Sequence, residues 1–387
     1  MLLSLCLAAS GFGLVLIYSA TRYLDSNRSV IIQTVAIFLG VLVYIAMSSV
    51  DIELFVDRSW KLLLAFNLLF VLSTRVPGLG VSRGGNLSWI HIPRFPVDIQ
   101  PAEIVKLTFI LLLSWQCARL QERGKDISSI PSVLQLGGHL LLMCGTIAVA
   151  SGDFGMLLTY LLIFVFILWV AGVKKRWFLL GLGGAAGGVG LVAWLFTHSQ
   201  QFHDRFSYIL LRFTVVIDHL LGNPDTIQEQ TLGKGMQQSR SILAIGSGQL
   251  TGHGYLQGVQ TQSSSNWALN ARSTDEIFAV CGEEFGLIGC VLLLLLLGAI
   301  ILRCIWVARR ACSPQSAYLV MGYAGMLLAQ VGVNVAMCLY IFPVVGLTLP
   351  FISYGGSSII TMYAAMGMVS SVKMRSLPSW LRDRSKL

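Results

Sequence analysis

The stretch "STDEIFAVCGEEFGLIGCVLLLLLLGAIIL" (residues 273–302) joins a cluster of acids directly to a long apolar run. The whole chain has 18 aspartates and glutamates, and four of them lie inside this stretch within ten consecutive positions. The apolar run is long enough to cross a hydrocarbon core of about 30 Å, which takes roughly 20 helical residues. The stretch therefore predicts a membrane-spanning helix with carboxylates at its start. These acids are Asp275, Glu276, Glu283 and Glu284.

Composition places the chain in a membrane. Of its 387 residues, 55% are hydrophobic and only 12% are charged, and the mean hydropathy is +0.74. This leaves too little polar surface to coat a soluble globule, so we expect an integral membrane protein. The first apolar segment begins almost at Met1 without a basic region or a small-residue cleavage site, which predicts a retained span rather than a signal peptide.

Apolar segments of spanning length recur along the chain and predict an all-α membrane protein, with residues 1–387 as one polytopic domain. The order of the segments leaves a long extracytoplasmic loop, residues 198–276, between the seventh and eighth helices. About ten transmembrane helices are expected, at residues 2–20, 30–49, 60–74, 100–118, 131–150, 155–173, 178–197, 277–303, 315–342 and 350–373.

The basic residues predict the orientation. With a cytoplasmic N-terminus, 16 of them fall on short inner segments and ten on longer outer loops, as the positive-inside rule requires. Both termini are then cytoplasmic. The net charge of +9 is therefore mainly a topology signal, with some attraction to anionic lipid, and does not indicate nucleic acid. The inner residues are Arg58, Lys61, Arg119, Arg123, Lys125, Lys174, Lys175, Arg176, Arg303, Arg309, Arg310, Lys373, Arg375, Arg382, Arg384 and Lys386.

Two parts of the long loop suggest contact with lipid or phosphate. The segment "FHDRFSYILLRFTVVIDHLL" (202–221) has the spacing of an amphipathic helix, which either lies in the membrane interface against a lipid substrate or packs on the bundle. Four glycines punctuate residues 246–254, and such backbone can expose N–H groups to phosphate, although the spacing matches neither a Walker A loop nor a dinucleotide fingerprint. A second glycine cluster, residues 181–190, is better explained by close helix packing.

Ionisable residues at membrane depth are candidates for function, because burying them is costly. Glu103 and Lys106 lie in "QPAEIVK" (100–106) and Asp153 in "SGDFG" (151–155), all near the outer surface. The alternative for Glu103 and Lys106 is an i,i+3 ion pair that satisfies itself. For the opening acids the alternative is a capping box, with Ser273 and Glu276 three residues apart. That alternative leaves Glu283 and Glu284 unexplained, and Glu276 and Glu283 share a helical face that would line a wet cavity.

The segment "FPVVGLTLPFISYGGSS" (342–358) interrupts an apolar region with two prolines and three glycines. Non-helical backbone at membrane depth is tolerated where it is buried in protein or lines a water-filled cavity. A plain outer turn followed by a helix start is the alternative.

Four stretches together resemble the SEDS family (shape, elongation, division and sporulation), whose best-known members are RodA and FtsW. They occur in the same order and spacing, and the match covers essentially the whole chain, including the ten spans and the long seventh-to-eighth loop. The stretches are "GGNLSWIHIPRFPVDIQPAEIVK" (84–106), "SILAIGSGQLTGHG" (241–254), "STDEIFAVCGEEFGLIG" (273–289) and "FPVVGLTLPFISYGGSS" (342–358).

The resemblance implies a peptidoglycan glycosyltransferase that polymerises lipid II on the outer face of the bacterial cytoplasmic membrane, together with a class B penicillin-binding protein. It transfers the role of the essential family acid to Asp275, that of the lysine closing "QPAEIVK" to Lys106, and that of the tryptophan in "LSWIHI" to Trp89. Asp153 and Gly155 also match a family stretch. Further substrate-binding or supporting candidates are Glu103, Glu283, Glu284, Ser353, Tyr354, Gly355 and Gly356.

The implied reaction joins a sugar hydroxyl to an anomeric carbon and expels undecaprenyl pyrophosphate. Asp275 would remove the hydroxyl proton as general base. Lys106, Arg240, Lys234 or a divalent cation such as Mg²⁺ or Mn²⁺ would neutralise the pyrophosphate. In a different interpretation Lys106 holds Asp275 in a structural salt bridge.

Two other functions are compatible with these residues. A lipid II flippase would also carry polar groups within its spans, and a non-catalytic scaffold would only hold the transpeptidase. The acids gather at the outer ends of the spans, whereas a flippase needs a polar path into the inner half of the bilayer. The placement of the acids therefore favours the enzyme.

Overall fold

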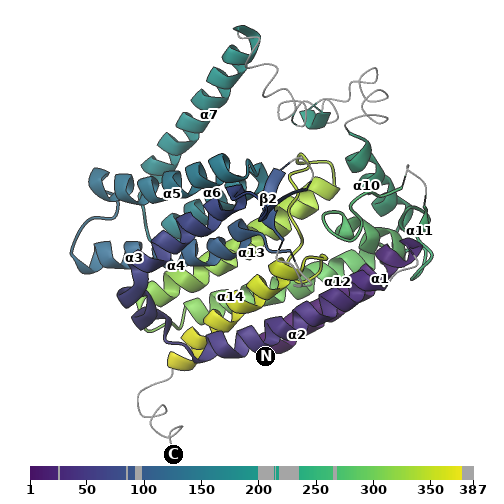
Figure 1. Cartoon of the computed structure of the whole chain (residues 1–387), viewed down its shortest axis with the longest axis horizontal. Coiled ribbons are helices and arrows are strands. Elements are labelled where there is room, and N and C mark those ends of the chain that lie inside the picture. The colour runs from purple at the N-terminus through teal and green to yellow at the C-terminus, as the bar shows by residue number, and fades with distance from the viewer. Residues whose placement is uncertain are drawn as a thin grey trace, which may run out of the picture.

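The computed structural model describes residues 1–24, 27–83, 86–91, 98–198, 213, 215–217, 235–264 and 268–376. Long helices make up most of this part of the chain (Figure 1). They are α1 (Leu2–Thr21), α2 (Arg28–Ser49), α3 (Ile52–Leu72), α4 (Pro101–Glu122), α5 (Ile130–Ala150), α6 (Phe154–Val170), α7 (Lys175–His198), α12 (Ile277–Ala308), α13 (Pro314–Cys338) and α14 (Gly356–Arg375).

Shorter elements lie between these helices. Two helices, α10 (Met236–Ser247) and α11 (Val259–Gln262), belong to the predicted long loop. A hairpin of β1 (Gly80–Arg83) and β2 (Asn86–Ile90) pairs antiparallel, with Val81 opposite Trp89. Two 3₁₀ turns, η1 (Arg22–Leu24) and η2 (Ser73–Arg75), follow α1 and α3.

The expected all-α fold is confirmed, and each of the ten predicted segments overlaps one of the long helices. Among the described residues, six helices are long and apolar enough to cross a membrane: α1 extended by η1, α2, α4, α5, α12 and α13. The number of ten spans stays a prediction. Part of the loop 198–276, including most of the proposed interfacial segment 202–221 and Lys234, lies outside the described residues.

Helix α3 begins eight residues earlier than the sequence predicted. Asp51 caps its first turn by accepting a hydrogen bond from the Leu54 backbone N–H at 3.3 Å, and Glu53 lies in that turn, where a negative charge is favoured. The apolar periodicity alone did not show this start, because the first turns carry Glu53, Asp57 and Arg58.

The segment 339–355 is not helical, which corrects the ends expected for the last two spans. Tyr340, Gly346 and Phe351 have positive φ angles. Four apolar side chains of this segment are buried: Leu347, Leu349, Phe351 and Ile352. The non-helical backbone is therefore enclosed by protein, as expected for such backbone at membrane depth.

Helix α4 forms the centre of the bundle and contacts α3, α5, α6 and α13. Helix α14 packs against α2 on one side of the molecule (Figure 1). Small residues allow this approach: a Cβ at Gly40 would lie 2.8 Å from the Tyr363 ring, and one at Gly367 would lie 2.6 Å from the Tyr44 carbonyl oxygen. Gln33 of α2 also accepts a hydrogen bond from the Gly355 backbone N–H at 3.1 Å, so α2 fixes the start of α14.

The glycine-rich segment 246–254 packs its backbone on α12. A Cβ at Gly248 or Gly252 would overlap carbonyl oxygens of that helix. Helix α12 is broken at Gly286, which has φ +65°, and the carbonyl oxygens of Glu283 and Glu284 accept hydrogen bonds from the backbone N–H groups of His253 and Gly254, both at 3.0 Å. Close packing on α12 explains Gly248 and Gly252, whereas Gly246 has no atom within 4 Å of an added Cβ and Gly254 has φ +103°.

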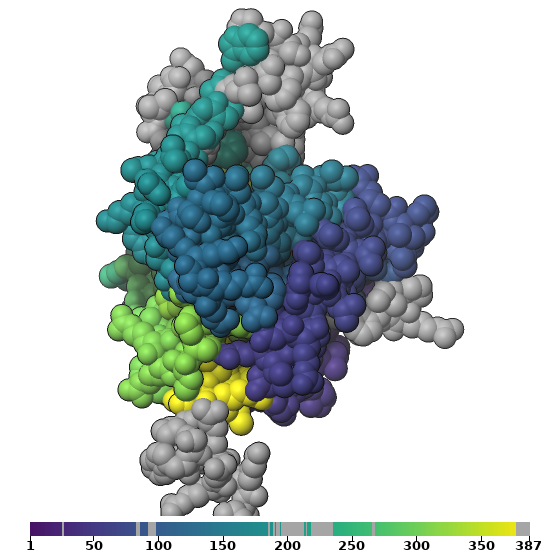
Figure 2. All heavy atoms as spheres, turned by 90° about the vertical axis from the view of Figure 1, so that its left-hand side faces the viewer, coloured from purple at the N-terminus to yellow at the C-terminus, as the bar shows by residue number. Residues whose placement is uncertain are grey.

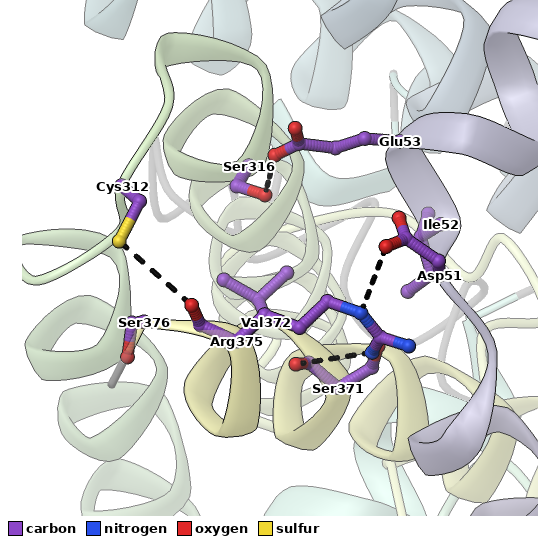
Figure 3. A pocket seen from close by; sticks show the side chains of 9 residues that line it. All are labelled: Asp51, Ile52, Glu53, Cys312, Ser316, Ser371, Val372, Arg375 and Ser376. Atoms are coloured by element: carbon purple, nitrogen blue, oxygen red, sulfur yellow. Dashed lines mark hydrogen bonds and ion pairs between the residues drawn. The ribbon is translucent and has the colours of Figure 1, made fainter. Parts of the chain in front are cut away.

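The end of the bundle that carries most inner basic residues is fastened by polar contacts (Figure 3). Arg375, at the end of α14, pairs with Asp51 at 3.1 Å and also bonds to Ser371. Glu53 accepts hydrogen bonds from the hydroxyls of Ser313 and Ser316. Helix α7 departs from this body and rises above it (Figures 1 and 2).

Candidate functional site

A cavity of about 890 Å³ opens at the end of the bundle opposite to these basic residues. The starts of α2, α4, α6 and α14 and the loop that enters α12 contribute to its wall, together with β2 and the segment 344–348. Helix N-termini carry partial positive charge and free N–H groups, so these four helix starts favour an anionic ligand. The acids on the wall are Asp98, Glu103, Asp153 and Asp275.

Asp275 lies in the loop just before α12 and is held by its backbone. Its carbonyl oxygen accepts a hydrogen bond from Asn334 Nδ2 at 2.8 Å, and the same amide donates to the Leu347 carbonyl oxygen at 2.7 Å. Ser353 donates to the Thr274 carbonyl oxygen at 2.6 Å. The segment after α13 thus fixes the loop, which leaves the Asp275 side chain on the cavity wall.

The same contacts correct the predicted capping box. The Tyr354 backbone N–H donates to the Ser273 carbonyl oxygen at 2.8 Å, and α12 begins only at Ile277, with Glu276 as its N-cap residue. Ser273 is therefore three residues too early to cap the helix. Its role is to join the loop to the segment that precedes α14.

Burial and neighbouring carboxylates raise the pKa values of Asp275 and Asp153 in the cavity. Burial raises the pKa of the Asp275 carboxyl to about 6, with a further contribution from the negative charge of Asp153. Burial also raises the pKa of Asp153, again helped by a nearby carboxylate, that of Glu103. A carboxylate with a pKa near 6 is still ionised at pH 7 and is a stronger base than an ordinary aspartate.

Glu103 and Lys106 form the predicted i,i+3 ion pair. Lys106 Nζ lies 2.9 Å from Glu103 Oε2, and the two residues are 0% and 2% exposed. Glu103 is on the cavity wall, whereas Lys106 lies nearly one turn deeper in α4. Within the described part of the chain, Lys106 makes no ion pair with Asp275, so the structure places it behind Glu103 and not at the acid.

Asp153 caps α6 by accepting from the Met156 backbone N–H at 3.1 Å, and Gln100 Nε2 donates to its other oxygen at 3.1 Å. Gly155 follows in the first turn of α6. A Cβ at this position would overlap the Val345 carbonyl oxygen and lie 3.4 Å from Asp153 Oδ1. Gly155 therefore allows the segment 344–348 to reach the cavity.

Replacing Gly155 by alanine is expected to destabilise the protein by about 1–3 kcal/mol, the usual effect of overpacking a fixed backbone contact. The measurement is thermal unfolding in detergent. Gly145→Ala is the matched control, because Gly145 lies in α5 with no atom within 4 Å of its added Cβ. Equal melting temperatures for the two variants would contradict the close approach at Gly155.

Glu283 and Glu284 lie outside the cavity and bind other parts of the chain. Glu283 accepts hydrogen bonds from the backbone N–H groups of Gln260 and Thr261 and from the Thr261 hydroxyl, at 2.6–2.9 Å. Glu284 accepts from Ser19 at 2.6 Å and from Gln262 at 3.1 Å. These contacts correct the expectation that Glu276 and Glu283 share a wet cavity, because neither residue is on its wall. Glu283 and Glu284 instead hold α11 and α1 against α12.

The structure brings the other candidates together only in part. Trp89, Tyr354, Gly355 and Gly356 join Asp275 on the cavity wall. Ser353 is buried and acts on the loop of Asp275, as described above. Arg240 lies in α10 but is not on the wall, and Lys234 lies outside the described residues.

The sequence matches the cell cycle protein family of FtsW, RodA and SpoVE over residues 1–377. The chain belongs to this family. It is 31% identical over 376 residues to stage V sporulation protein E of Bacillus subtilis (strain 168), covering 94% of this chain and 93% of the relative. It is also 32% identical over 338 residues to peptidoglycan glycosyltransferase MrdB of Escherichia coli (strain K12), covering 87% and 83%.

A solved structure described as "Structural coordination of polymerization and crosslinking by a peptidoglycan synthase complex" matches the fold with a TM-score of 0.77 and 25% identity, covering 98% of both chains. The resemblance to the SEDS family inferred from the sequence is thus confirmed, and this member is a multi-pass membrane protein. Its sequence relatives thus include a stage V sporulation protein and a protein named as a peptidoglycan glycosyltransferase.

The donor atoms in the cavity of this FtsW/RodA/SpoVE protein suit a hard cation such as Mg²⁺, which prefers carboxylate oxygens. In the part of the chain that the structure describes, however, no three His, Cys, Asp or Glu residues lie close enough together to hold a metal ion. The described residues therefore do not form a site for a resident metal by themselves.

Three residues that line or support the cavity of this family member were not predicted from the sequence. Arg28 reaches the cavity from the start of α2, Gln100 orients Asp153, and Asn334 holds the loop of Asp275. A signal existed for Arg28, because it is a basic residue on a short outer segment, against the positive-inside trend. No local pattern marks Asn334, which acts across 59 positions of sequence.

Proposed function

We propose that this peptidoglycan glycosyltransferase polymerises lipid II in the cavity that Asp275 lines. The single observation that carries the proposal is the position of Asp275: a carboxylate with a raised pKa on the wall of a large cavity surrounded by helix N-termini. The family relationship supplies the substrate class. The geometry supplies the roles of the residues.

In the proposed reaction Asp275 accepts the proton of the acceptor sugar's 4-hydroxyl. The hydroxyl oxygen then forms a bond to the anomeric carbon of the donor sugar. The bond from that carbon to the pyrophosphate oxygen breaks, and its electron pair leaves with undecaprenyl pyrophosphate. General base help of this kind is typically worth about 10²- to 10⁴-fold in rate.

The leaving pyrophosphate needs positive charge. Arg28 supplies a full charge at the cavity wall, and each helix N-terminus contributes about 0.3–1 kcal/mol toward an anion placed at it. This assignment replaces the expected role of Lys106, which lies deeper and pairs with Glu103. A role for Arg240 or Lys234 in neutralising the pyrophosphate stays a proposal. Arg240 is not on the wall, and Lys234 lies outside the described residues.

We place the cavity on the extracytoplasmic face of the bacterial cytoplasmic membrane and both termini in the cytoplasm. The excess of basic residues at the opposite end supports this orientation. We also propose a class B penicillin-binding protein as the partner that crosslinks the new strands. The fold match to a structure described as a peptidoglycan synthase complex supports that partnership.

The test is polymerisation of labelled lipid II by the purified full-length chain, with and without the partner, read as glycan strand length on a gel. We expect strands in at least the complex. Transfer of lipid II across liposome membranes with no strands in either condition would favour the flippase. Absence of both activities would favour the scaffold.

The raised pKa of Asp275 predicts an acid limb in the pH profile. The base is lost as the pH falls through about 6, so kcat/KM is expected to drop about tenfold for each pH unit below that value. Asp153→Asn removes a neighbouring negative charge, which lowers the pKa of Asp275 and moves the limb to lower pH. Asp126→Asn, in the loop after α4, is the control and should leave the limb in place. A limb that does not respond to Asp153→Asn contradicts the coupling.

A further inference from the structure

Three cations surround one tryptophan at the end of the bundle opposite to the catalytic cavity. Trp306 lies in the last turns of α12 and is partly buried. Arg303 Cζ and Arg310 Cζ lie 4.1 and 4.0 Å from its ring centroid, and Lys373 Nζ of α14 lies at 4.8 Å. An aromatic face attracts each cation, but three like charges this close repel one another unless an anion joins them.

No acid among the described residues supplies that anion. In the described ranges, none of these three cations lies within ion-pair distance of a carboxylate. Two other basic residues at the same end do have a carboxylate partner. Arg375 pairs with Asp51, as Figure 3 shows, and Lys174 pairs with Asp126 at 2.9 Å. The cluster of Arg303, Arg310 and Lys373 around Trp306, called here the Trp306 cluster, is therefore a local excess of positive charge.

A pocket of about 260 Å³ adjoins the Trp306 cluster. Arg303 and Lys373 line it together with the hydroxyl side chains of Tyr44, Ser48 and Ser370. The remainder of its wall is apolar and comes from the start of α1 and from the last turns of α12 and α14. These residues are Met1, Leu2, Val307, Val369 and Met374.

The surroundings of the pocket are those of a membrane surface. Leu302, next to Arg303, is 67% exposed, and Ile45, next to Tyr44, is 56% exposed. Exposed aliphatic side chains at the end of spanning helices face acyl chains, while basic and hydroxyl groups beside them meet headgroups. Free phosphate has no acyl chains to place against these side chains.

We infer that the Trp306 cluster and its pocket bind the headgroup of an anionic phospholipid from the membrane leaflet at this end. The phosphodiester would lie between Arg303 and Lys373, with its glycerol hydroxyls toward Ser48 and Ser370. Helices α12 and α14 both begin at the catalytic cavity and end at this pocket. A bound lipid would therefore join the far ends of these two helices. At their near ends, Asp275 precedes α12 and Gly356 begins α14.

The test uses the purified full-length protein in mild detergent, titrated with phosphatidylglycerol, cardiolipin or phosphatidylcholine and measured by native mass spectrometry. The two anionic lipids should be retained in preference to phosphatidylcholine. A basic residue near an anionic headgroup contributes about fivefold to binding, so Arg303→Gln combined with Lys373→Gln should weaken retention roughly 30-fold. Arg309→Gln removes one charge from an exposed residue beyond the pocket and should change retention less than about twofold.

Equal retention of phosphatidylcholine by the wild type would overturn the inference, and so would equal retention by the double variant and Arg309→Gln. Displacement of the lipid by millimolar inorganic phosphate would identify a phosphate site and would also overturn it. If the double variant does not fold, Lys373→Gln in the last turn of α14 gives the same test with an expected loss of about fivefold. Unchanged retention in that variant counts against the lipid site.

Discussion

Asp275→Asn is expected to lower lipid II polymerisation by about 10²- to 10⁴-fold while the protein still folds and inserts. Asparagine keeps the shape of the side chain but cannot accept the hydroxyl proton. The backbone contacts that hold this loop, from Asn334 to the Asp275 carbonyl oxygen and from Ser353 to the Thr274 carbonyl oxygen, do not involve the replaced carboxylate. The loss should therefore appear in kcat with little effect on structure.

Stability should not fall in this variant. The pKa of Asp275 is raised in the folded protein, so its charged form opposes folding at pH values above its ordinary range. Asparagine removes that charge, and the melting temperature at pH 7 should be equal to that of the wild type or higher. A catalytic defect accompanied by a higher melting temperature is difficult to explain by misfolding.

The measurement pairs the polymerisation assay with thermal unfolding of the same preparation. Asp126→Asn is the matched control, because Asp126 is an exposed loop aspartate far from the cavity, paired with Lys174. Polymerisation by Asp275→Asn at more than about a tenth of the wild-type rate would remove the general base assignment. A large fall in melting temperature would instead indicate a structural role.

Local patterns predicted the parts of the site that depend on neighbours in sequence. The i,i+3 spacing of Glu103 and Lys106 predicted their ion pair, since residues three apart share a helix face. The apolar run after Gly286 predicted a spanning helix, with Asp275 just before its start. Alternating topology then placed the starts of the even-numbered spans at one end, where the cavity is.

Long-range contacts explain the errors. Nothing near Glu284 in the sequence indicates that it accepts a hydrogen bond from Ser19, 265 positions away. Glu283 satisfies the start of the short helix α11, which no apolar pattern predicts. A buried carboxylate is equally compatible with catalysis and with fastening two segments, and only the position of its donors distinguishes them.

Lys106→Met is expected to destabilise the protein by about 3–5 kcal/mol, because it leaves the buried Glu103 carboxylate without its cation. Methionine keeps much of the apolar stem, so the loss of packing is small. The measurement is thermal and denaturant unfolding in detergent. Lys61→Met, an exposed lysine in α3, is the control and should change stability by less than about 0.5 kcal/mol.

The double variant Glu103→Gln with Lys106→Met distinguishes the two roles considered for Lys106. If the lysine serves only the ion pair, neutralising both partners removes the unpaired charge and should recover most of the lost stability. Polymerisation by this folded double variant would then exclude Lys106 from the reaction, in agreement with its place behind Glu103. Lost polymerisation with recovered stability would mean that the cavity needs the Glu103 carboxylate or the charge of Lys106, and the single variant Glu103→Gln would show which. A Lys106→Met protein as stable as the wild type would contradict the buried pair itself.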